Sequence, residues 1–287
     1  MNRLSSILVV GVCQANHLGR ILNAIPSVVS RFNVCAIELC ADPITGEYRT
    51  PPPEILETCE CVYFQRGTAD VLPGYMERLI AQGKSQRFPI MFCQALWPAH
   101  TELRRKLPEP GLPWGRFPYC DRVLLDLLET GQEDSRIADR YLHTDLARMF
   151  DLDRLVELWR YQMEDADKSC DVVLAELQWR EWRDTRHYWA LSHPTNRLFG
   201  EVLRKLLART IGPVAEEELL GSLRANELDQ FMTPIHPSVA RHFGLKWCSP
   251  DDLYAWPDGP FTIRQWALEH VRYTRRVLAM GDGTAAG

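Results

Sequence analysis

The sequence predicts an α/β fold, with a parallel sheet and flanking helices in the N-terminal part followed by a mostly helical portion. Over the first hundred residues, short apolar runs alternate with segments of helical periodicity, which indicates βαβ units. From 119 to 183 almost the whole sequence has helical spacing. We expect one large domain over 1–287, with the α/β portion at about 1–100, the helical portion at about 119–183, and a return to the sheet with C-terminal helices at about 187–280.

The first strand is expected at Ile7–Val12, because this continuous apolar and β-branched run is typical of a strand buried on both faces. A polar, turn-like segment from Cys13 to His17 follows, and the apolar spacing then predicts a helix over Leu18–Ile25. Further strands are predicted at Asn33–Leu39, Cys61–Phe64 and Pro89–Cys93, and further helices at Pro73–Gln82, Asn196–Ala208 and Phe261–Met280. The short apolar stretch Tyr188–Leu191 is expected to return to the sheet, and Asp151 is the predicted N-cap of a helix.

Composition limits the function classes. The formal net charge of −5 argues against a bulk-charge route to nucleic acid, which normally needs a basic excess. Nine cysteines, an odd number scattered through apolar runs, argue against a disulfide framework. Cys59 and Cys61 lack the further ligands of a structural zinc site, so no metal site is predicted. We expect a cytoplasmic protein without a membrane span, because no apolar run approaches transmembrane length and no signal cleavage site is evident.

The first candidate functional segment is Gly11-Val12-Cys13-Gln14-Ala15-Asn16-His17. A strand that opens directly into a helix places these residues at the carboxyl edge of the sheet, where α/β proteins bind ligands. The N–H groups and dipole of the helix should lower the pKa of the Cys13 thiol and could stabilise an oxyanion. The alternative is that Cys13 is a small residue packed in a tight turn. The hydrogen-bonding side chains of Gln14, Asn16 and His17 favour the functional interpretation.

The second candidate segment is Ser192-His193-Pro194-Thr195-Asn196-Arg197, which follows a predicted short strand and opens a helix. His193 is predicted to be a general base or acid, since imidazole titrates near neutral pH. The alternative is a capped helix start with an exposed histidine.

Two further segments carry histidines. Gln94, Trp97 and His100 follow the fourth predicted strand and would share the sheet edge of Cys13; the alternative is an ordinary loop with a packed tryptophan. His236 stands in Thr233-Pro234-Ile235-His236-Pro237-Ser238, where a structural turn leading into a helix is the stronger interpretation.

Basic and aromatic groups supply possible ligand contacts. Arg20 and the run Arg104-Arg105-Lys106 could bind a polyphosphate, or could belong to a solvated face. Trp179 and Trp182, within Trp-Arg-Glu-Trp-Arg, fall on one side of a helix. Core packing is the default interpretation of this pair, and stacking on an adenine is the alternative.

Taken together, these motifs resemble the WcbI-type polysaccharide biosynthesis proteins, a family described as acetyltransferases. The resemblance rests on the strand-Gly-x-Cys-Gln opening, the His-Pro-x-Asn segment, and the late Pro-Ile-His-Pro followed by a Val-Ala helix, in this order from Ile7 to Leu245. It implies a cradle-like fold that binds coenzyme A, with the cysteine of the first motif in the pocket, and O-acetylation of a capsular sugar.

Carried over to this sequence, the resemblance puts Cys13 and Gln14 in the coenzyme pocket and His193 and Asn196 near it. One position departs from the family pattern: the residue before the cysteine is usually Asn, and here it is Val12.

The residues and the resemblance predict a coenzyme A-dependent acyltransferase that moves the acetyl group of acetyl-coenzyme A to a sugar or polysaccharide hydroxyl. Cys13 either takes the acyl group covalently or shapes the thioester site while His193 deprotonates the acceptor. The alternatives are an ester or thioester hydrolase with a Cys/His site, and a non-catalytic coenzyme A-binding or scaffold protein. The predicted coenzyme A or substrate contacts are Gln14, Asn16, His17, Arg20, Gln94, Trp97, His100, Asn196 and His236.

Overall fold

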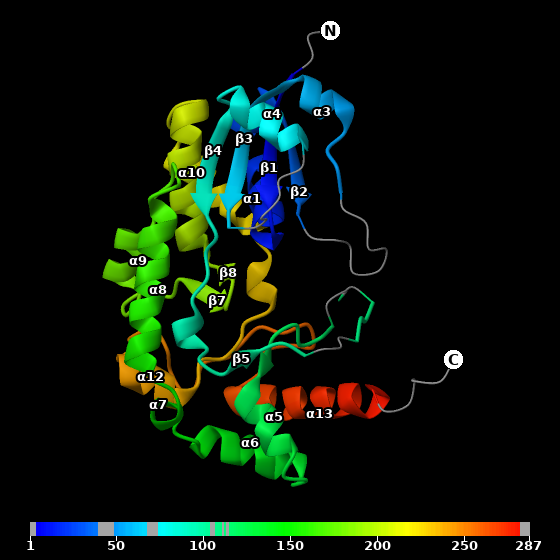
Figure 1. Cartoon of the computed structure of the whole chain (residues 1–287), viewed down its shortest axis with the longest axis vertical. Coiled ribbons are helices and arrows are strands. Elements are labelled where there is room, and N and C mark those ends of the chain that lie inside the picture. The colour runs from blue at the N-terminus through cyan, green and yellow to red at the C-terminus, as the bar shows by residue number, and fades with distance from the viewer. Residues whose placement is uncertain are drawn as a thin grey trace. The chain divides into compact units, whose positions relative to one another are not determined.

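A computed structural model describes residues 4–39, 49–67, 74–103, 107–110, 112 and 115–281 of the chain (Figure 1). The chain forms two compact units. The first unit comprises residues 1–92 and 158–229, and the second comprises 93–157 and 230–287. Within the described residues, none of the helices combines the length and the apolar character needed to cross a bilayer.

The first unit is built on a four-stranded parallel sheet with the strand order β2-β1-β3-β4. Its strands are β1 (Ser5–Gly11), β2 (Phe32–Glu38), β3 (Cys59–Arg66) and β4 (Ser85–Pro89). This sheet and its flanking helices confirm the predicted fold class. Because β2 and β3 pair with opposite edges of β1, the strand order reverses between β1 and β3. In open parallel sheets, ligands bind at the carboxyl ends of the strands at such a switch point.

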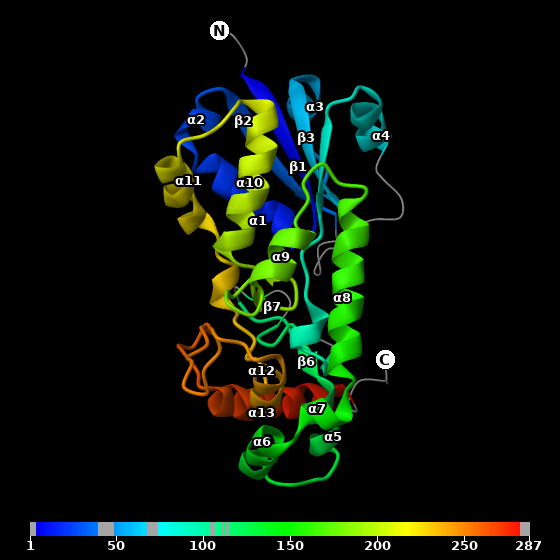
Figure 2. The same ribbon diagram turned by 90° about the vertical axis from the view of Figure 1, so that its left-hand side faces the viewer.

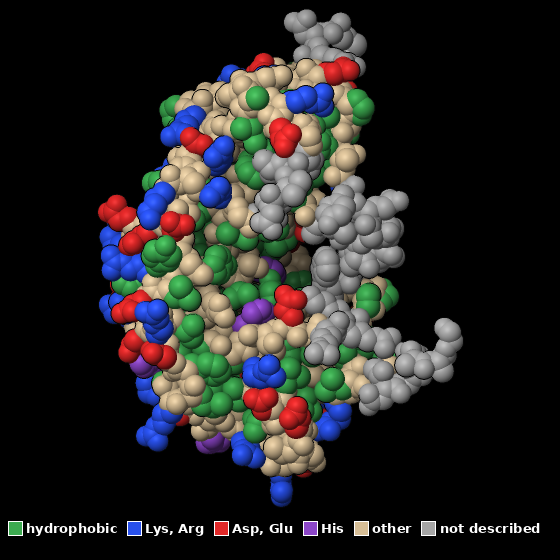
Figure 3. All heavy atoms as spheres, in the orientation of Figure 1, with side chains coloured by type: hydrophobic (Ala, Val, Ile, Leu, Met, Phe, Trp, Pro, Cys, Tyr) green, Lys and Arg blue, Asp and Glu red, His purple; other side chains and the backbone are tan. Residues whose placement is uncertain are grey.

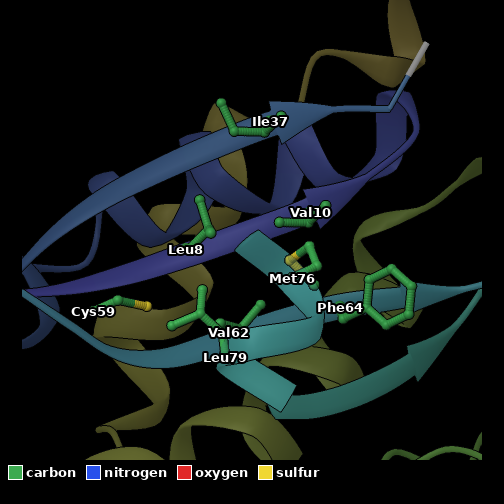
Figure 4. Packing of buried hydrophobic residues seen from close by; sticks show 8 residues of the cluster. All are labelled: Leu8, Val10, Ile37, Cys59, Val62, Phe64, Met76 and Leu79. Atoms are coloured by element: carbon green, nitrogen blue, oxygen red, sulfur yellow. The ribbon is translucent and has the colours of Figure 1, made fainter. Parts of the chain in front are cut away.

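Helices cover both faces of this sheet (Figures 1 and 2). On one face, Met76 and Leu79 of α4 (Gly74–Ala81) pack on Leu8 and Val10 of β1 (Figure 4). On the other face lie α1 (Cys13–Asn23) and α10 (Asn196–Thr210). From Cys61 onward the side chains of β3 alternate between these layers, after a register shift in its pairing with β1 between Cys59 and Cys61. The core cluster of the α4 face consists of Leu8, Val10, Ile37, Cys59, Val62, Phe64, Met76 and Leu79.

The close approach of α1 to β2 depends on Gly19. A Cβ added to this glycine would lie 2.5 Å from the Cβ of Ala36. This distance is well inside ordinary van der Waals contact, and Ala36 is held by its parallel pairing with Val9 of β1. The fit between the first helix and the sheet therefore requires a residue without a side chain at this position.

Three predicted elements differ from the structure. The fourth strand is Ser85–Pro89, not Pro89–Cys93. As an edge strand it needs no continuous apolar run, and Pro89 has no N–H to extend the ladder. The stretch from Tyr188 does not join the parallel sheet, because β7 (Tyr188–Ala190) pairs antiparallel with β8 (His193–Pro194) in a separate two-stranded sheet. The first helix begins at Cys13, so the segment predicted to be a turn is its first turn.

The remaining elements of the first unit are mostly short helices. The predicted cap at Asp151 is confirmed, since its carboxylate accepts a hydrogen bond of 2.9 Å from the Arg154 N–H at the start of α8. The helices are α2 (Pro26–Val29), α3 (Pro53–Glu57), α8 (Leu152–Asp167), which the two units share, α9 (Ala175–Glu181) and α11 (Glu216–Ser222), followed by the 3-10 turns η2 (Leu223–Ala225) and η3 (Leu228–Gln230).

The second unit is mainly helical and has an aromatic core. The Phe117 ring stacks on Trp256 with 4.8 Å between ring centroids and packs edge-on against the buried His270 at 4.8 Å. The elements are η1 (Gln94–Leu96), β5 (His100–Thr101), β6 (Cys120–Asp121), α5 (Arg122–Leu128), α6 (Asp134–His143), α7 (Leu146–Met149), α12 (Pro237–Phe243) and α13 (Ile263–Gly281).

The Gly19 contact gives a test of the packing. In an open helix, Gly→Ala stabilises by about 0.5–1 kcal/mol. At Gly19 the overlap with Ala36 should outweigh this gain, and we expect Gly19→Ala to lower the free energy of unfolding by about 1–3 kcal/mol in urea titrations. Gly221→Ala in α11 is the matched control, because a Cβ there meets nothing within 4 Å. Adding Ala36→Gly should recover part of the loss; equal effects at the two glycines would contradict the close approach.

Candidate functional site

Cys13 is the first helical residue of α1 and directly follows Val12, the N-cap residue after β1. It therefore lies at the carboxyl edge of the sheet, at the end of the strand where the order reverses. Its side chain is half-buried, and the backbone N–H groups of Cys13 and Gln14 lie where they favour the thiolate. Among the described residues, none of the side chains caps this helix N-terminus.

The protonation of Cys13 differs from the prediction. The pKa of its thiol is raised to about 11, first because burial penalises the thiolate and then because the carboxylate of Glu38 repels it. The two backbone N–H groups act in the expected direction, but their effect on the pKa is smaller. The expectation of a lowered pKa is therefore wrong, and the resting group at neutral pH is the thiol.

A buried amide pair, Gln14 and Gln65, holds the site together. The Gln14 Nε2 group donates to the carbonyl oxygens of Met91 at 2.6 Å and Ser192 at 2.7 Å. Its Oε1 accepts from the Met91 N–H at 3.1 Å and from the Gln65 Nε2 at 2.5 Å. All four hydrogen-bonding positions of the Gln14 amide are thus used within the protein. The side chain is fully buried, so it fixes the surrounding segments instead of presenting a free group.

Gln65 completes the pair from the carboxyl end of β3. Its Oε1 accepts a 3.0 Å hydrogen bond from the backbone N–H of Val12. This arrangement needs Gly11, because a Cβ there would lie 2.6 Å from both Cβ and Oε1 of Gln65. Gly11, at the end of β1, thus lets the β3 glutamine reach the turn that carries Cys13.

Sequence analysis missed both Gln65 and Glu38. Each is a polar residue at the carboxyl end of a predicted strand, and Glu38 pairs in register with Gly11. Extending the sheet-edge argument from the first strand to the second and third would have found them.

The segment of His193 meets this turn directly. Gln14 binds the carbonyl of Ser192, the residue before His193, across 178 positions of sequence. The Nδ1 of His193 lies 3.2 Å from the carbonyl oxygen of Leu228. A carbonyl only accepts, so Nδ1 carries a proton, and in the neutral ring Nε2 carries the lone pair. Gln14 thus joins the segments of Cys13 and His193, the two residues that sequence analysis paired.

His17 is the second histidine of this region. Its Nδ1 accepts a 3.4 Å hydrogen bond from the backbone N–H of Glu227. Burial, followed by the nearby charges of Arg20 and His193, lowers the pKa of His17 to about 4, so the ring is neutral at physiological pH. The segment around Glu227, which the sequence did not single out, thus contacts both histidines.

Three more predicted residues of the first unit are held by protein groups. Asn16 donates through Nδ2 to the carboxylate of Glu38. Arg20 is exposed and forms an ion pair with Glu227. Asn196 is exposed at the start of α10, and its Oδ1 accepts a 2.8 Å hydrogen bond from the Asn226 side chain.

The other predicted residues belong to the second unit and are fixed by contacts inside it. Trp97 is buried and donates through Nε1 to the carbonyl of Pro234 at 3.1 Å. His236 caps α12 by accepting from the Ser238 N–H at 3.2 Å, and its Nε2 lies 2.9 Å from the carbonyl oxygen of Tyr141. The ring of His100 packs edge-on against Tyr119, with the centroids 5.6 Å apart.

The expected position of Gln94, Trp97 and His100 directly after a sheet strand is wrong, because β4 ends at Pro89 and an irregular segment precedes η1. Gln94 itself is exposed. The basic run 104–106 lies outside the described residues.

The fold and the site define a parallel α/β unit in which a thiol and a histidine segment meet at the switch point of the sheet. The family model described as "Polysaccharide biosynthesis enzyme WcbI" matches residues 6–212, and the chain belongs to this family. The suspected resemblance is thereby confirmed.

The fold is also similar to a solved structure of WcbI, which is described as a novel polysaccharide biosynthesis enzyme. The TM-score is 0.67 at 12% identity, and the match covers 96% of this chain and 91% of that chain. That structure is described as the native protein without the disulfide bond between coenzyme A and one of its cysteines. None of the curated proteins matches this chain.

The buried amide pair can be tested by Gln14→Leu. This change removes the four hydrogen bonds that the amide makes to Met91, Ser192 and Gln65, and a buried polar group left unsatisfied costs about 1–3 kcal/mol. We expect the free energy of unfolding to fall by about 3 kcal/mol or more, measured by urea denaturation. Gln82→Leu, at an exposed glutamine, is the control and should change stability by less than about 0.5 kcal/mol. A Gln14 variant as stable as the control would refute the structural role of the pair.

The effect of Glu38 on the thiol predicts a pH dependence. Removing its negative charge with Glu38→Gln should lower the pKa of Cys13 below about 11 and so increase the thiolate fraction at a given pH. Iodoacetamide labelling of Cys13, followed by peptide mass spectrometry from pH 7 to 11, should show the rise in rate beginning at lower pH. Glu60→Gln is the control, because Glu60 lies at the amino end of β3, on the same sheet but at the edge opposite to Cys13. Superimposable profiles for both variants and the wild type would exclude the proposed repulsion.

Proposed function

We propose that this chain transfers an acyl group, acetyl in the first instance, from a coenzyme A thioester to a hydroxyl of a sugar or polysaccharide. The observation that carries the proposal is the junction of Cys13 with the His193 segment through Gln14 at the switch point of the sheet. Membership of a family of polysaccharide biosynthesis enzymes supports the acceptor class. The similar structure, whose description links coenzyme A with a cysteine, supports the donor.

The surroundings of Cys13 suit the thioester end of the donor better than its phosphates. The thiol is half-buried beside two helix N–H groups, which can donate hydrogen bonds to the carbonyl oxygen of a thioester. The carboxylate of Glu38 repels phosphate, and Arg20 is already paired with Glu227. We therefore place the acyl end of the coenzyme at Cys13 and its phosphates away from Glu38.

Direct transfer is the route that the protonated thiol of Cys13 favours. The Nε2 of His193 takes the proton of the acceptor hydroxyl while the hydroxyl oxygen attacks the thioester carbonyl carbon. The oxyanion that forms is stabilised by the first-turn N–H groups of α1. The carbon–sulfur bond then breaks, and the coenzyme A thiolate takes the proton back from the imidazolium of His193. The ester product and the free coenzyme leave.

The raised pKa of Cys13 argues against the two mechanisms that need a thiolate. Covalent acyl transfer through Cys13 and hydrolysis by a cysteine nucleophile both require the thiol to lose a proton that burial and Glu38 stabilise. A biosynthetic family also favours transfer over hydrolysis. Cys13 then acts by shaping the thioester site, and Gln14 acts by positioning it.

Two substitutions at the site separate these mechanisms. His193→Asn keeps an N–H donor near the position of Nδ1 but removes the base Nε2, and should lower the rate of coenzyme A release in the presence of acceptor by about 10²–10⁴-fold. Cys13→Ala should lower it by less than about tenfold. Release can be followed with a thiol reagent, using free sugars and oligosaccharides as acceptors.

The contrary results are distinct. An acetyl adduct seen by rapid-quench intact mass in the wild type and absent in Cys13→Ala would support the covalent route. Rapid release without any acceptor would support hydrolysis. Binding itself is read by thermal unfolding, since a ligand at a hundred times its dissociation constant stabilises by about 2.7 kcal/mol. No shift with coenzyme A or acetyl-coenzyme A would overturn the proposal.

A further inference from the structure

The first unit holds a pocket that shares no residue with the Cys13 site. It lies where α9 runs between α8 and α10 (Figure 2), and its volume is about 520 Å³. This volume falls in the range of small-molecule sites. The lining residues are Arg160, Glu164, Asp167, Val173, Ala175, Glu176, Leu177, Trp179, Arg180, Glu201 and Lys205.

Trp179 gives the pocket an aromatic wall that is held rigidly from the core. The buried Trp159 packs edge-on against the buried Trp182 at 5.8 Å, and Trp182 stacks with Trp179 at 6.1 Å between centroids. Only Trp179 of these three lines the pocket, where it is half-buried. Core packing thus explains Trp182 but leaves the indole of Trp179 on the pocket wall.

The ring face of Trp179 is already occupied by an exposed polar side chain. The guanidinium of Arg160 lies 4.6 Å from the ring centroid, and its side chain is 48% exposed. The negative face of an indole attracts cations and the polarised C–H bonds of a sugar ring in the same way. The guanidinium also pairs with the exposed carboxylate of Glu164 at 2.8 Å, and such a surface i,i+4 pair contributes only about 0.3–0.5 kcal/mol. A sugar ring can therefore replace Arg160 on this face at small cost, while the guanidinium donates hydrogen bonds to its hydroxyls.

The charges of the pocket discriminate between ligand classes. Its lining contains four carboxylates, of Glu164, Asp167, Glu176 and Glu201, and three cations, of Arg160, Arg180 and Lys205. Figure 3 shows acidic and basic side chains interspersed along this edge of the unit. A nucleotide polyphosphate would meet net repulsion here. Sugar hydroxyls, which both donate and accept, can satisfy carboxylates and cations alike.

We propose that this pocket is a carbohydrate-binding subsite, with Trp179 as the platform on which a sugar ring stacks and the surrounding charged side chains as its hydroxyl partners. It binds a glycan independently of the acyl chemistry at Cys13. The saccharide then contacts the enzyme at two places, this pocket and the Cys13 site. The adenine-stacking alternative for the Trp179–Trp182 pair does not fit the carboxylates around it.

The experiment uses the full chain on an array of bacterial capsular and O-antigen oligosaccharides, followed by saturation-transfer NMR with the best binder. We expect the strongest transfer to ring C–H protons of one sugar residue. Trp179→Ala should weaken binding at least tenfold, and Trp179→Phe should retain most of it. Tyr161→Ala is the matched control, since Tyr161 is an exposed aromatic of α8 that does not line the pocket, and it should bind as the wild type does.

Each other outcome overturns the proposal. Absence of binding to every oligosaccharide, or equal binding by Trp179→Ala and Tyr161→Ala, means that the pocket is not a glycan subsite. Binding of ADP that Trp179→Ala abolishes would assign the pocket to a nucleotide. The thermal shift with coenzyme A, measured on the same variants, reads the Cys13 site separately, so failure of one proposal is distinguishable from failure of the other.

Discussion

The first unit depends on one buried amide, that of Gln14. Its four hydrogen bonds tie the start of α1 to the carboxyl end of β3, to the segment after β4 and to the turn before His193. A buried amide left without partners would cost several kcal/mol, so the positions of these segments relative to one another are coupled through Gln14. The same interaction that stabilises the switch point of the sheet therefore also fixes the relation between the cysteine and histidine segments. In this site, stability and the function that we propose rest on the same hydrogen bonds.

The electrostatics of Cys13 show which of two opposing effects is larger. A helix N-terminus favours a thiolate by about 0.3–1 kcal/mol. A rise of the pKa from 9.0 to about 11 corresponds to roughly 3 kcal/mol in the other direction. Burial and the carboxylate of Glu38 therefore dominate. A thiol that stays protonated is also protected from adventitious oxidation, because oxidation proceeds through the thiolate. Such a residue is suited to lining a thioester pocket, and in the mechanism that we propose the proton transfer falls to His193.

Much of the fold could be predicted, because buried parallel strands leave apolar runs that a single sequence records, as at Ile7–Val12. The edge strand Ser85–Pro89 was not predicted because its residues are mostly polar or half-buried. The apolar run after it buries Met91 and Cys93 but lies outside the described strands. The partners of Gln14, 77 and 178 residues away, follow from tertiary packing and no local pattern contains them. The pKa of Cys13 was missed for the same reason, since burial and the register that brings Glu38 beside Gly11 both arise only on folding.

Val12 shows how a departure from the family pattern can be accommodated. An Asn at the N-cap position would use its side chain to accept from a first-turn N–H of α1. Val12 has no such acceptor, and its own N–H is taken by Gln65. The N–H of Gln14 then favours the thiolate of Cys13, and the N–H of Ala15 donates to the carbonyl of Val12 at 2.7 Å. With Val12 in place of Asn, no capping side chain competes for the first-turn N–H groups, which stay available to the thiol and to a thioester oxygen. The oxyanion function that we propose therefore rests on the backbone and does not need the asparagine.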